Sequence, residues 1–425
     1  MVSGAIVGAF VIVALERRYA DDLSRRMTWL APGGADAVRS VLGVLAGSVI
    51  TIAGVAYSIL IVALSLASQQ LGPRVLVAFR ADRGIQVVLG TFVATFTFCI
   101  LVMSRVGRSN GEEPIPYLGV GIALLLGLLS VGVLIYFIHH AAAVIQADYV
   151  IAAIGSDLRW TIRRLLTNDD DESAPQPTPA DMPAADFEQT ARCISTGASG
   201  YIRTIDHAHL VAIARRYDLL VRVERPAGRF VLPETAVLRA YPAEAVDDRV
   251  ARQLWRAIAL GCTRTHAQDV EFGINQLVEI AVRALSPGIN DPSTAQRCVD
   301  RLAEALRTIL CTPRPRTIHR DCTGRVRLLT PPMHIDDLFD AALHQIRQNS
   351  VGKPSMAIHM IQTLTLLVSA AGTEAGRRAI RRHADLIMYD NEAALKNPSD
   401  LEDLRRRHIA LHAEANQAAG QQQAN

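Results

Sequence analysis

The fold is decided by one stretch of the sequence, residues 41–67, which reads VLGVLAGSVITIAGVAYSILIVALSLA. It carries no charge and is longer than the roughly 20 residues that a helix needs to cross about 30 Å of hydrocarbon. Residues 85–103 and 117–138 meet the same length test, and a polar segment with glycine and proline separates them. The sequence therefore predicts three membrane spans.

A shorter apolar run, residues 2–15, precedes them and ends at Glu16. At 1.5 Å per residue, about 14 residues are too short for the hydrocarbon thickness. A signal peptide is a poor alternative, because no basic region precedes the run and no clear small-residue cleavage site follows it. A tilted or bilayer-thinning helix, or a start codon placed too late, fits better, so we count a fourth span. Residues 1–140 are thus predicted to form a transmembrane helical bundle of three to four spans.

The composition fits a split architecture. The chain has 425 residues, 50% of them hydrophobic, with a mean hydropathy of +0.20, which is long for one domain and apolar for a soluble protein. The net charge of +3 gives no reason to expect nucleic acid as a partner. The lipid bilayer is the partner that the spans imply.

The side of the membrane is inferred from two opposing signals. Six cysteines lack CxxC spacing, and the five that follow the spans cannot all pair within one chain, which favours a reducing compartment. The positive-inside rule instead favours a cytoplasmic first loop, because that loop holds several arginines. We give the cysteines more weight and predict a multi-pass protein of the bacterial cytoplasmic (inner) membrane with a cytoplasmic C-terminal region. The arginines are Arg17, Arg18, Arg25, Arg26 and Arg39.

The region after the spans is predicted to be α+β. Residues 141–167 look like a helical extension of the last span, and residues 168–198 contain an acidic, proline-rich linker. Residues 199–245 form a β-rich module, residues 246–412 a helical domain, and residues 413–425 a polar tail that we expect to be disordered.

The β-rich module has short alternating strands around the turn Pro226-Ala227-Gly228. This pattern resembles barrel-sandwich modules of the biotinyl and lipoyl type. The lysine that carries the cofactor in those modules is absent from the turn. We therefore expect a structural or docking role, with no lipoate, biotin or other cofactor.

The helical domain contains a predicted helical hairpin. Asp269 is placed to cap one helix, residues 285–288 (LSPG) end it, and Asp291-Pro292 begins the next. The run RALSPGINDP at residues 283–292, with DVEFGI at residues 269–274, resembles the bacterial family of predicted membrane proteins called domain of unknown function 2254. The resemblance covers nearly the whole chain and implies a membrane protein without a known activity.

Three groups of residues are candidate sites. His139 and His140 end the last span and could bind a metal or sense protons, or simply form its polar end. A cytoplasmic motif could hold a cation through its carboxylates, although capping alone explains two of them. It consists of Asp269, Glu271, Arg283, Asn290 and Asp291. Ser286 lacks the GxSxG context of a nucleophile. We predict no catalytic residue, no metal site and no enzymatic activity.

Small and hydroxylated residues within the spans form the third group. Gly47, Thr51 and Ser58 share one face of a helix, whereas Leu45 and Ile59 lie on faces that we expect to meet lipid. Such a stripe could line a pore or pack helices. The predicted function is a homo-oligomeric channel or transporter for ions or small solutes; the alternative is a membrane-anchored scaffold or signalling protein. The pore or packing candidates are Gly43, Gly47, Thr51, Ser58, Thr91 and Thr95.

Overall fold

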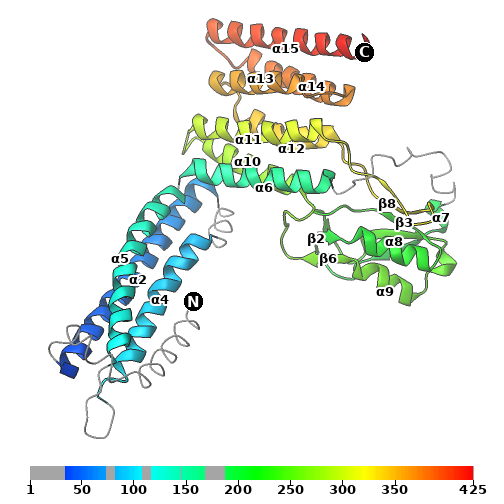
Figure 1. The fold of residues 1–425 in the computed structure, drawn as a ribbon. Helices are drawn as coiled ribbons and strands as arrows, with labels where there is room; N and C mark the ends of the chain where they lie inside the picture. The colour runs from blue at the N-terminus through cyan, green and yellow to red at the C-terminus, as the bar shows by residue number, and fades with distance from the viewer. Residues whose placement is uncertain (1–33, 73–81, 108–115, 145, 168–186, 425) are drawn as a thin grey trace. The chain divides into compact units, whose positions relative to one another are not determined.

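The computed structural model describes five stretches of the chain: residues 34–72, 82–107, 116–144, 146–167 and 187–424. These fall into two compact units, one up to Val150 and one from Ile151 onward (Figure 1). The first unit holds the long apolar helices. The second holds the strands and the remaining helices.

Three helices in the first unit are long and apolar enough to cross a membrane. They are α2 (Gly34–Leu71), α4 (Arg83–Met103) and α5 (Tyr117–Val144). The three predicted spans are therefore confirmed, and α4 packs against both other helices. The fourth span predicted at residues 2–15 lies outside the described residues.

The interior of this bundle is made of side chains that the three helices turn toward one another. Leu42 and Phe92 are completely buried. A Cβ atom added at Gly127 of α5 would lie 2.5 Å from a Leu45 methyl group, so the absence of a side chain lets α2 and α5 approach closely. Leu45 consequently packs against the bundle core, and the prediction that it faces lipid is wrong.

Helix α6 (Ala147–Thr167) lies in the second unit apart from its first turn, and the same unit contains two sheets. Their strand orders are β1-β5-β3-β8-β7 and β4-β2-β6. The helices α7 (Phe187–Thr190), α8 (His207–Arg216) and α9 (Asp248–Arg256) accompany them, with a short 3-10 turn at Ala243–Ala245. The strands are β1 (Arg192–Ser195), β2 (Gly200–Ile205), β3 (Leu220–Val223), β4 (Phe230–Val231), β5 (Ala236–Tyr241), β6 (Ile258–Gly261), β7 (Ile318–Arg320) and β8 (Val326–Leu329).

Both sheets are open, so the predicted barrel-sandwich module is wrong. Strand β8 joins β3 in parallel, with Val221 opposite Leu328, although more than 100 residues separate them. Strand β6, also beyond residues 199–245, pairs with β2. The individual strands expected within that segment do form. The error lies in their partners, which a local pattern of strands and turns cannot specify.

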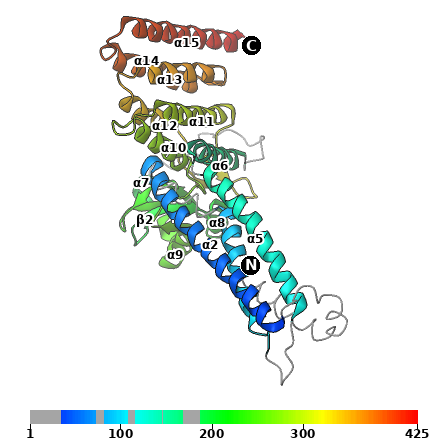
Figure 2. The ribbon, with the colours of Figure 1, turned by 90° about the vertical axis from the view of Figure 1, so that its left-hand side faces the viewer.

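From α10 onward the second unit contains six stacked helices, which we call the hairpin stack (Figure 2). Helices two apart in the sequence touch, as α10 and α12, α11 and α13, α12 and α14, and α13 and α15, and the hairpin partners α10 and α11, and α14 and α15, also touch. Every second helix begins with proline, at Pro292, Pro354 and Pro398. The helices are α10 (Val270–Ala284), α11 (Pro292–Cys311), α12 (Ile335–Asn349), α13 (Pro354–Val368), α14 (Glu374–Glu392) and α15 (Pro398–Ala424).

The last helix corrects the prediction of a disordered tail at residues 413–425. Helix α15 continues to Ala424. Leu411 and Ala415 are completely buried and anchor it against the stack. The alanine and glutamine residues that follow have high helix propensity, and they extend a helix that tertiary packing has already nucleated.

Candidate functional site

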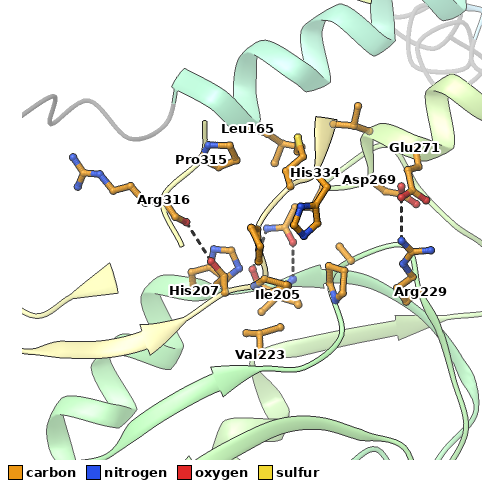
Figure 3. A pocket seen from close by; sticks show the side chains of 18 of the residues that line it. Leu165, Ile205, His207, Val223, Arg229, Asp269, Glu271, Pro315, Arg316 and His334 are labelled. Atoms are coloured by element: carbon orange, nitrogen blue, oxygen red, sulfur yellow. Dashed lines mark hydrogen bonds and ion pairs between the residues drawn. The ribbon is translucent and has the colours of Figure 1, made fainter. Parts of the chain in front are cut away.

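The second unit contains a half-open cleft of about 320 Å³. Ile205, at the end of β2, and Val223, at the end of β3, give it an apolar floor, and Leu165 of α6 lies across from them (Figure 3). The first turn of α10, the loop after β3 and the segment between β8 and α12 supply the walls. A volume of this size with an apolar floor and polar walls suits a small organic ligand.

Asp269 anchors one wall of the cleft. Its carboxylate caps α10 by accepting a hydrogen bond of 3.0 Å from the Phe272 amide. The Arg264 guanidinium donates to both carboxylate oxygens, over 2.7 and 2.8 Å. This forked hydrogen bond raises the pKa of Arg264. Asp269 is only 5% exposed. Because little water reaches it, its charge is stabilised by the N-terminal end of α10 and by one arginine.

Gly228 brings the loop after β3 against that carboxylate. Its φ is +89°, in the region that favours glycine. A Cβ atom there would lie 2.2 Å from an Asp269 oxygen. The Gly228 amide donates to the Ile202 carbonyl over 2.8 Å. Beside it, Arg229 forms an ion pair of 3.0 Å with Glu271 (Figure 3). The loop therefore needs glycine at this position to close the wall.

Basic side chains surround the rest of the cleft. The rings of His207 and His319 lie 5.1 Å apart, and Thr330 donates to the Arg316 carbonyl over 3.2 Å. Arg164, near the end of α6, lies over the Trp160 ring at 5.2 Å. The six basic side chains that line the cleft are Arg164, His207, Arg229, Arg316, His319 and His334.

The residues of the predicted cytoplasmic motif lie at two separate places. Asp269 and Glu271 line the cleft, whereas Arg283, Asn290 and Asp291 lie at or beyond the other end of α10. That helix has 15 residues and is therefore about 22 Å long. The motif does not converge on one cation.

The turn after α10 has a structural explanation. Asn290 adopts φ +48°, a conformation that asparagine tolerates, and its amide donates to the Ser286 carbonyl over 2.8 Å. The Asp291 carboxylate then caps α11 through the Thr294 amide at 3.1 Å. The predicted caps at Asp269 and Asp291 and the predicted hairpin are confirmed.

The two histidines at the end of α5 have different surroundings. His140 Nε2 lies 3.0 Å from a carboxylate oxygen of Asp82, and its ring stacks on Tyr136 at 5.3 Å. Asp82 also caps α4. His139 Nδ1 lies 2.9 Å from the carbonyl of Ile135 in its own helix. Sequence reasoning missed the Asp82 partner, because 58 residues separate it from His140.

The candidates within the spans divide into two sets. Thr95 is buried, with its hydroxyl 3.4 Å from that of Ser130 on α5, and Thr91 is buried too. Thr51 and Ser58 are exposed on the outside of the bundle, and each donates to a carbonyl four residues earlier. Gly47 shares that outward face, and the Cβ position of Gly43 lies 4.0 Å from the Met103 sulfur.

The cleft residues that sequence reasoning missed are mostly basic. Arg264, which holds Asp269 from outside the lining of the cleft, was missed as well. It lies five residues before Asp269, and this spacing matches no known motif. His207 follows the helix cap Asp206, which marks a helix start but no site. His319 and His334 occur on either side of β8 and show no ligand spacing. The available signal was the Pro-Ala-Gly turn, because a glycine in a turn permits positive φ and a close backbone approach.

These features define an integral membrane protein with a large α/β region after its spans. The chain belongs to the family described as "Predicted membrane protein (DUF2254)", whose model matches residues 1–365. Uncharacterised proteins of Mycobacterium bovis and Mycobacterium tuberculosis are 28% identical over 377 residues, covering 87% of this chain and 70% of each relative. No solved structure matches the chain. The family resemblance seen in the sequence is confirmed.

Proposed function

We propose that this protein is a membrane-anchored signalling protein whose soluble region binds a small organic anion in the cleft. The observation that supports this proposal is the cleft itself, with an apolar floor of Ile205 and Val223 and six basic side chains around it. Apolar surface binds the body of a ligand, and charged donors fix its anionic group.

The state of the carboxylates favours binding over catalysis. Asp269 is occupied by Arg264 and by the end of α10, and Glu271 is paired with Arg229. A carboxylate whose oxygens already accept hydrogen bonds from an arginine is poorly placed to act as a general base, because those oxygens are not directed at a substrate proton. Arg229 is taken up by its pair with Glu271. Arg164, Arg316 and the three histidines then outnumber Asp337, the other acidic side chain that lines the cleft, so the field there favours an anion.

The chain connects the cleft to the spans through one helix. Arg164 and Leu165 lie in the last turn of α6, and α6 starts three residues after the end of α5. A ligand held by Arg164 would therefore restrain the far end of a helix that directly follows a membrane span. We infer that a ligand-dependent shift of that helix carries the signal.

The test is ligand binding by the full-length protein in lipid nanodiscs. Thermal-shift screening of carboxylate and phosphate metabolites should give at least one stabilising compound, whose affinity is then measured by calorimetry. Losing one charge-assisted hydrogen bond, worth about 1.5–3 kcal/mol, should make Arg164→Gln bind about 10- to 100-fold more weakly. Arg163→Gln is the matched control, because Arg163 is an exposed neighbour outside the cleft. Equal affinity in the two variants would contradict the proposal.

A second candidate, a homo-oligomeric channel or transporter, is favoured by the outer face of α2. Gly47, Thr51, Gly54 and Ser58 are all exposed there, and a Cβ atom at either glycine would meet no atom within 4 Å. Small residues on an outward face permit close approach of a second copy. Because both hydroxyls already donate to their own helix, they can face lipid, a partner or a lumen.

Bulky substitutions distinguish these arrangements. If the stripe lines a pore, Thr51→Leu or Ser58→Leu should block ion flux through proteoliposomes and leave the oligomer intact. If it packs helices, the same changes should dissociate the oligomer in native mass spectrometry. Ile59→Leu, on a different exposed face, is the control. A monomer in both detergent and lipid, with every variant silent, would eliminate this candidate.

We also propose that the soluble region lies in the cytoplasm. Successive spans alternate in direction, so the loop between α2 and α4, which contains Arg74 and Arg80, is on the same side as the chain after α5. The segment before α2 carries more arginines, so the positive-inside rule opposes this placement. The five cysteines that follow the spans cannot all pair within one chain, and we give more weight to the reducing compartment that they favour. A reporter that works only in the cytoplasm should be active when it is fused after Asn425. If only a reporter that works in the periplasm is active there, the topology is the reverse.

A further inference from the structure

The last helical hairpin carries a cluster of metal-ligating side chains that the proposed function does not use. His408 and His412 are four residues apart on α15, so they project from the same face of the helix. Asp385 of α14 faces them: its Oδ1 lies 2.8 Å from His408 Nε2 and 2.8 Å from His412 Nε2. The three ligand atoms all lie within 4.8 Å of one another.

The geometry is close to that of a zinc site. Zinc binds imidazole nitrogen and carboxylate oxygen at about 2.0–2.2 Å, so tetrahedral ligand atoms lie about 3.3 Å apart. Each histidine would have to retreat from Asp385 by about 0.5 Å, which requires only small side-chain rotations. Three protein ligands leave one coordination position. The partly exposed Asp385 side chain gives solvent access to it.

Hydrogen bonding explains the arrangement of these three side chains less completely than metal binding does. Two imidazoles share one carboxylate oxygen, and their ring centroids are only 4.6 Å apart. The two imidazoles and the carboxylate thus surround one point in space, as the ligands of a bound cation do. By comparison, the single pair of His359 and Asp300 shows the ordinary bond between one histidine and one carboxylate, over 2.8 Å.

A second cluster, Asp340, His344 and His383, has the same ligand types but a less suitable environment. Arg382 donates to the same Asp340 oxygen that both histidines approach. Arg347 lies 3.5 Å from the other nitrogen of His344. A divalent cation would meet two guanidinium groups there, and the Coulomb repulsion disfavours it. Three arginines also line the surface hollow that contains Asp385 and His412. Their ion pairs are formed with other carboxylates: Arg378 with Asp336, Arg381 with Glu374 and Arg382 with Asp340. The ion pairs of Asp385 itself are those with His408 and His412.

We propose that Asp385, His408 and His412 bind a divalent transition metal, with zinc as the ion that suits them best. Two imidazoles and one carboxylate are ligands that zinc accepts. The metal would join α15 to α14, two helices that already pack against each other.

The test measures zinc bound by the full-length protein, purified in detergent without a histidine tag. The protein is equilibrated with excess Zn²⁺, separated from free metal and analysed by elemental mass spectrometry. We expect one zinc per chain. Glutamine can still donate a hydrogen bond to Asp385 but is a poor zinc ligand, so His408→Gln and His412→Gln should each bring zinc to the background level and leave the circular dichroism of the metal-free protein unchanged.

Two controls decide between this site and others. His359→Gln removes a histidine of the isolated pair, and His344→Gln removes one from the second cluster; both variants should keep one zinc per chain. Loading with Co²⁺ should give the visible absorption of a tetrahedral ion in the wild type and in both controls. Absence of bound zinc, loss of it in His344→Gln, or its retention in His408→Gln and His412→Gln would each overturn the proposal.

Discussion

Replacing Gly228 by alanine tests the contact that closes the cleft wall. Two costs add at this position. A φ of +89° costs an L-residue about 1–2 kcal/mol. The new Cβ atom would lie 2.2 Å from Asp269 Oδ2 and 2.4 Å from its Cγ, so the carboxylate must leave the Phe272 amide that it caps, at a further cost of about 0.5–2 kcal/mol. The unfolding free energy should therefore fall by about 1.5–4 kcal/mol.

Gly197 supplies a matched control for the backbone term. Its φ is +64°, and a Cβ atom there would meet nothing within 4 Å. Gly197→Ala should consequently cost only the conformational term, about 1–2 kcal/mol. The difference between the two variants measures the coupling of the loop to Asp269.

The assay is hydrogen exchange measured by mass spectrometry on the full-length protein in detergent, across a series of urea concentrations. Gly228→Ala should accelerate exchange in the first turn of α10, where the Phe272 amide loses its acceptor, and lower the unfolding free energy of the soluble region. Gly197→Ala should leave that turn protected. Equal destabilisation by the two variants, or a protected first turn in Gly228→Ala, would refute the coupling.

Two further predictions concern single residues. Hydrogen bonding from the Thr294 hydroxyl is the largest influence on Asp291 and lowers the pKa of its carboxyl group; the stabilisation is present above the unfolded pKa, near 4, and is lost as the pH falls through the folded value. Asp291→Ala should lower the unfolding free energy by about 1 kcal/mol at pH 7 and by progressively less below about pH 4, in urea denaturation at each pH; a constant difference would exclude an ionised cap. Burial raises the pKa of the Cys298 thiol, so N-ethylmaleimide should modify it only after unfolding, whereas mass spectrometry should show rapid modification of the exposed Cys193, Cys262, Cys311 and Cys322. Rapid labelling of Cys298 in the native protein would contradict its placement.

The features that the sequence predicted correctly are those with local signals. Residues 41–67 reveal a span through length and composition alone, and Asp291-Pro292 reveals a helix start through two adjacent residues. The pairing of β3 with β8 has no such signal. It depends on packing between segments more than 100 residues apart, and the sequence pattern of β3 is compatible with either a barrel or an open sheet.

The same distinction applies to the sites. Asp269 was predicted as a helix cap from its immediate neighbours, and the structure confirms it. Its contact with Gly228 depends on tertiary packing, as does the pairing of His140 with Asp82. The hairpin stack could have been suspected from the repeated prolines, but the loops before them differ in sequence, which obscures the repetition.

Helix α10 links the cleft to the hairpin stack. Its N-terminal end is held by Asp269 at the cleft wall. At its C-terminal end, the Leu285 carbonyl accepts a hydrogen bond of 2.5 Å from Lys353, in the loop between α12 and α13. A ligand that displaced Glu271 from Arg229 would act on the first turn of a helix whose far end is tied to the next hairpin. Because packed helices shift as rigid bodies and do not bend continuously, the stack is the part of the soluble region that should respond to occupation of the cleft.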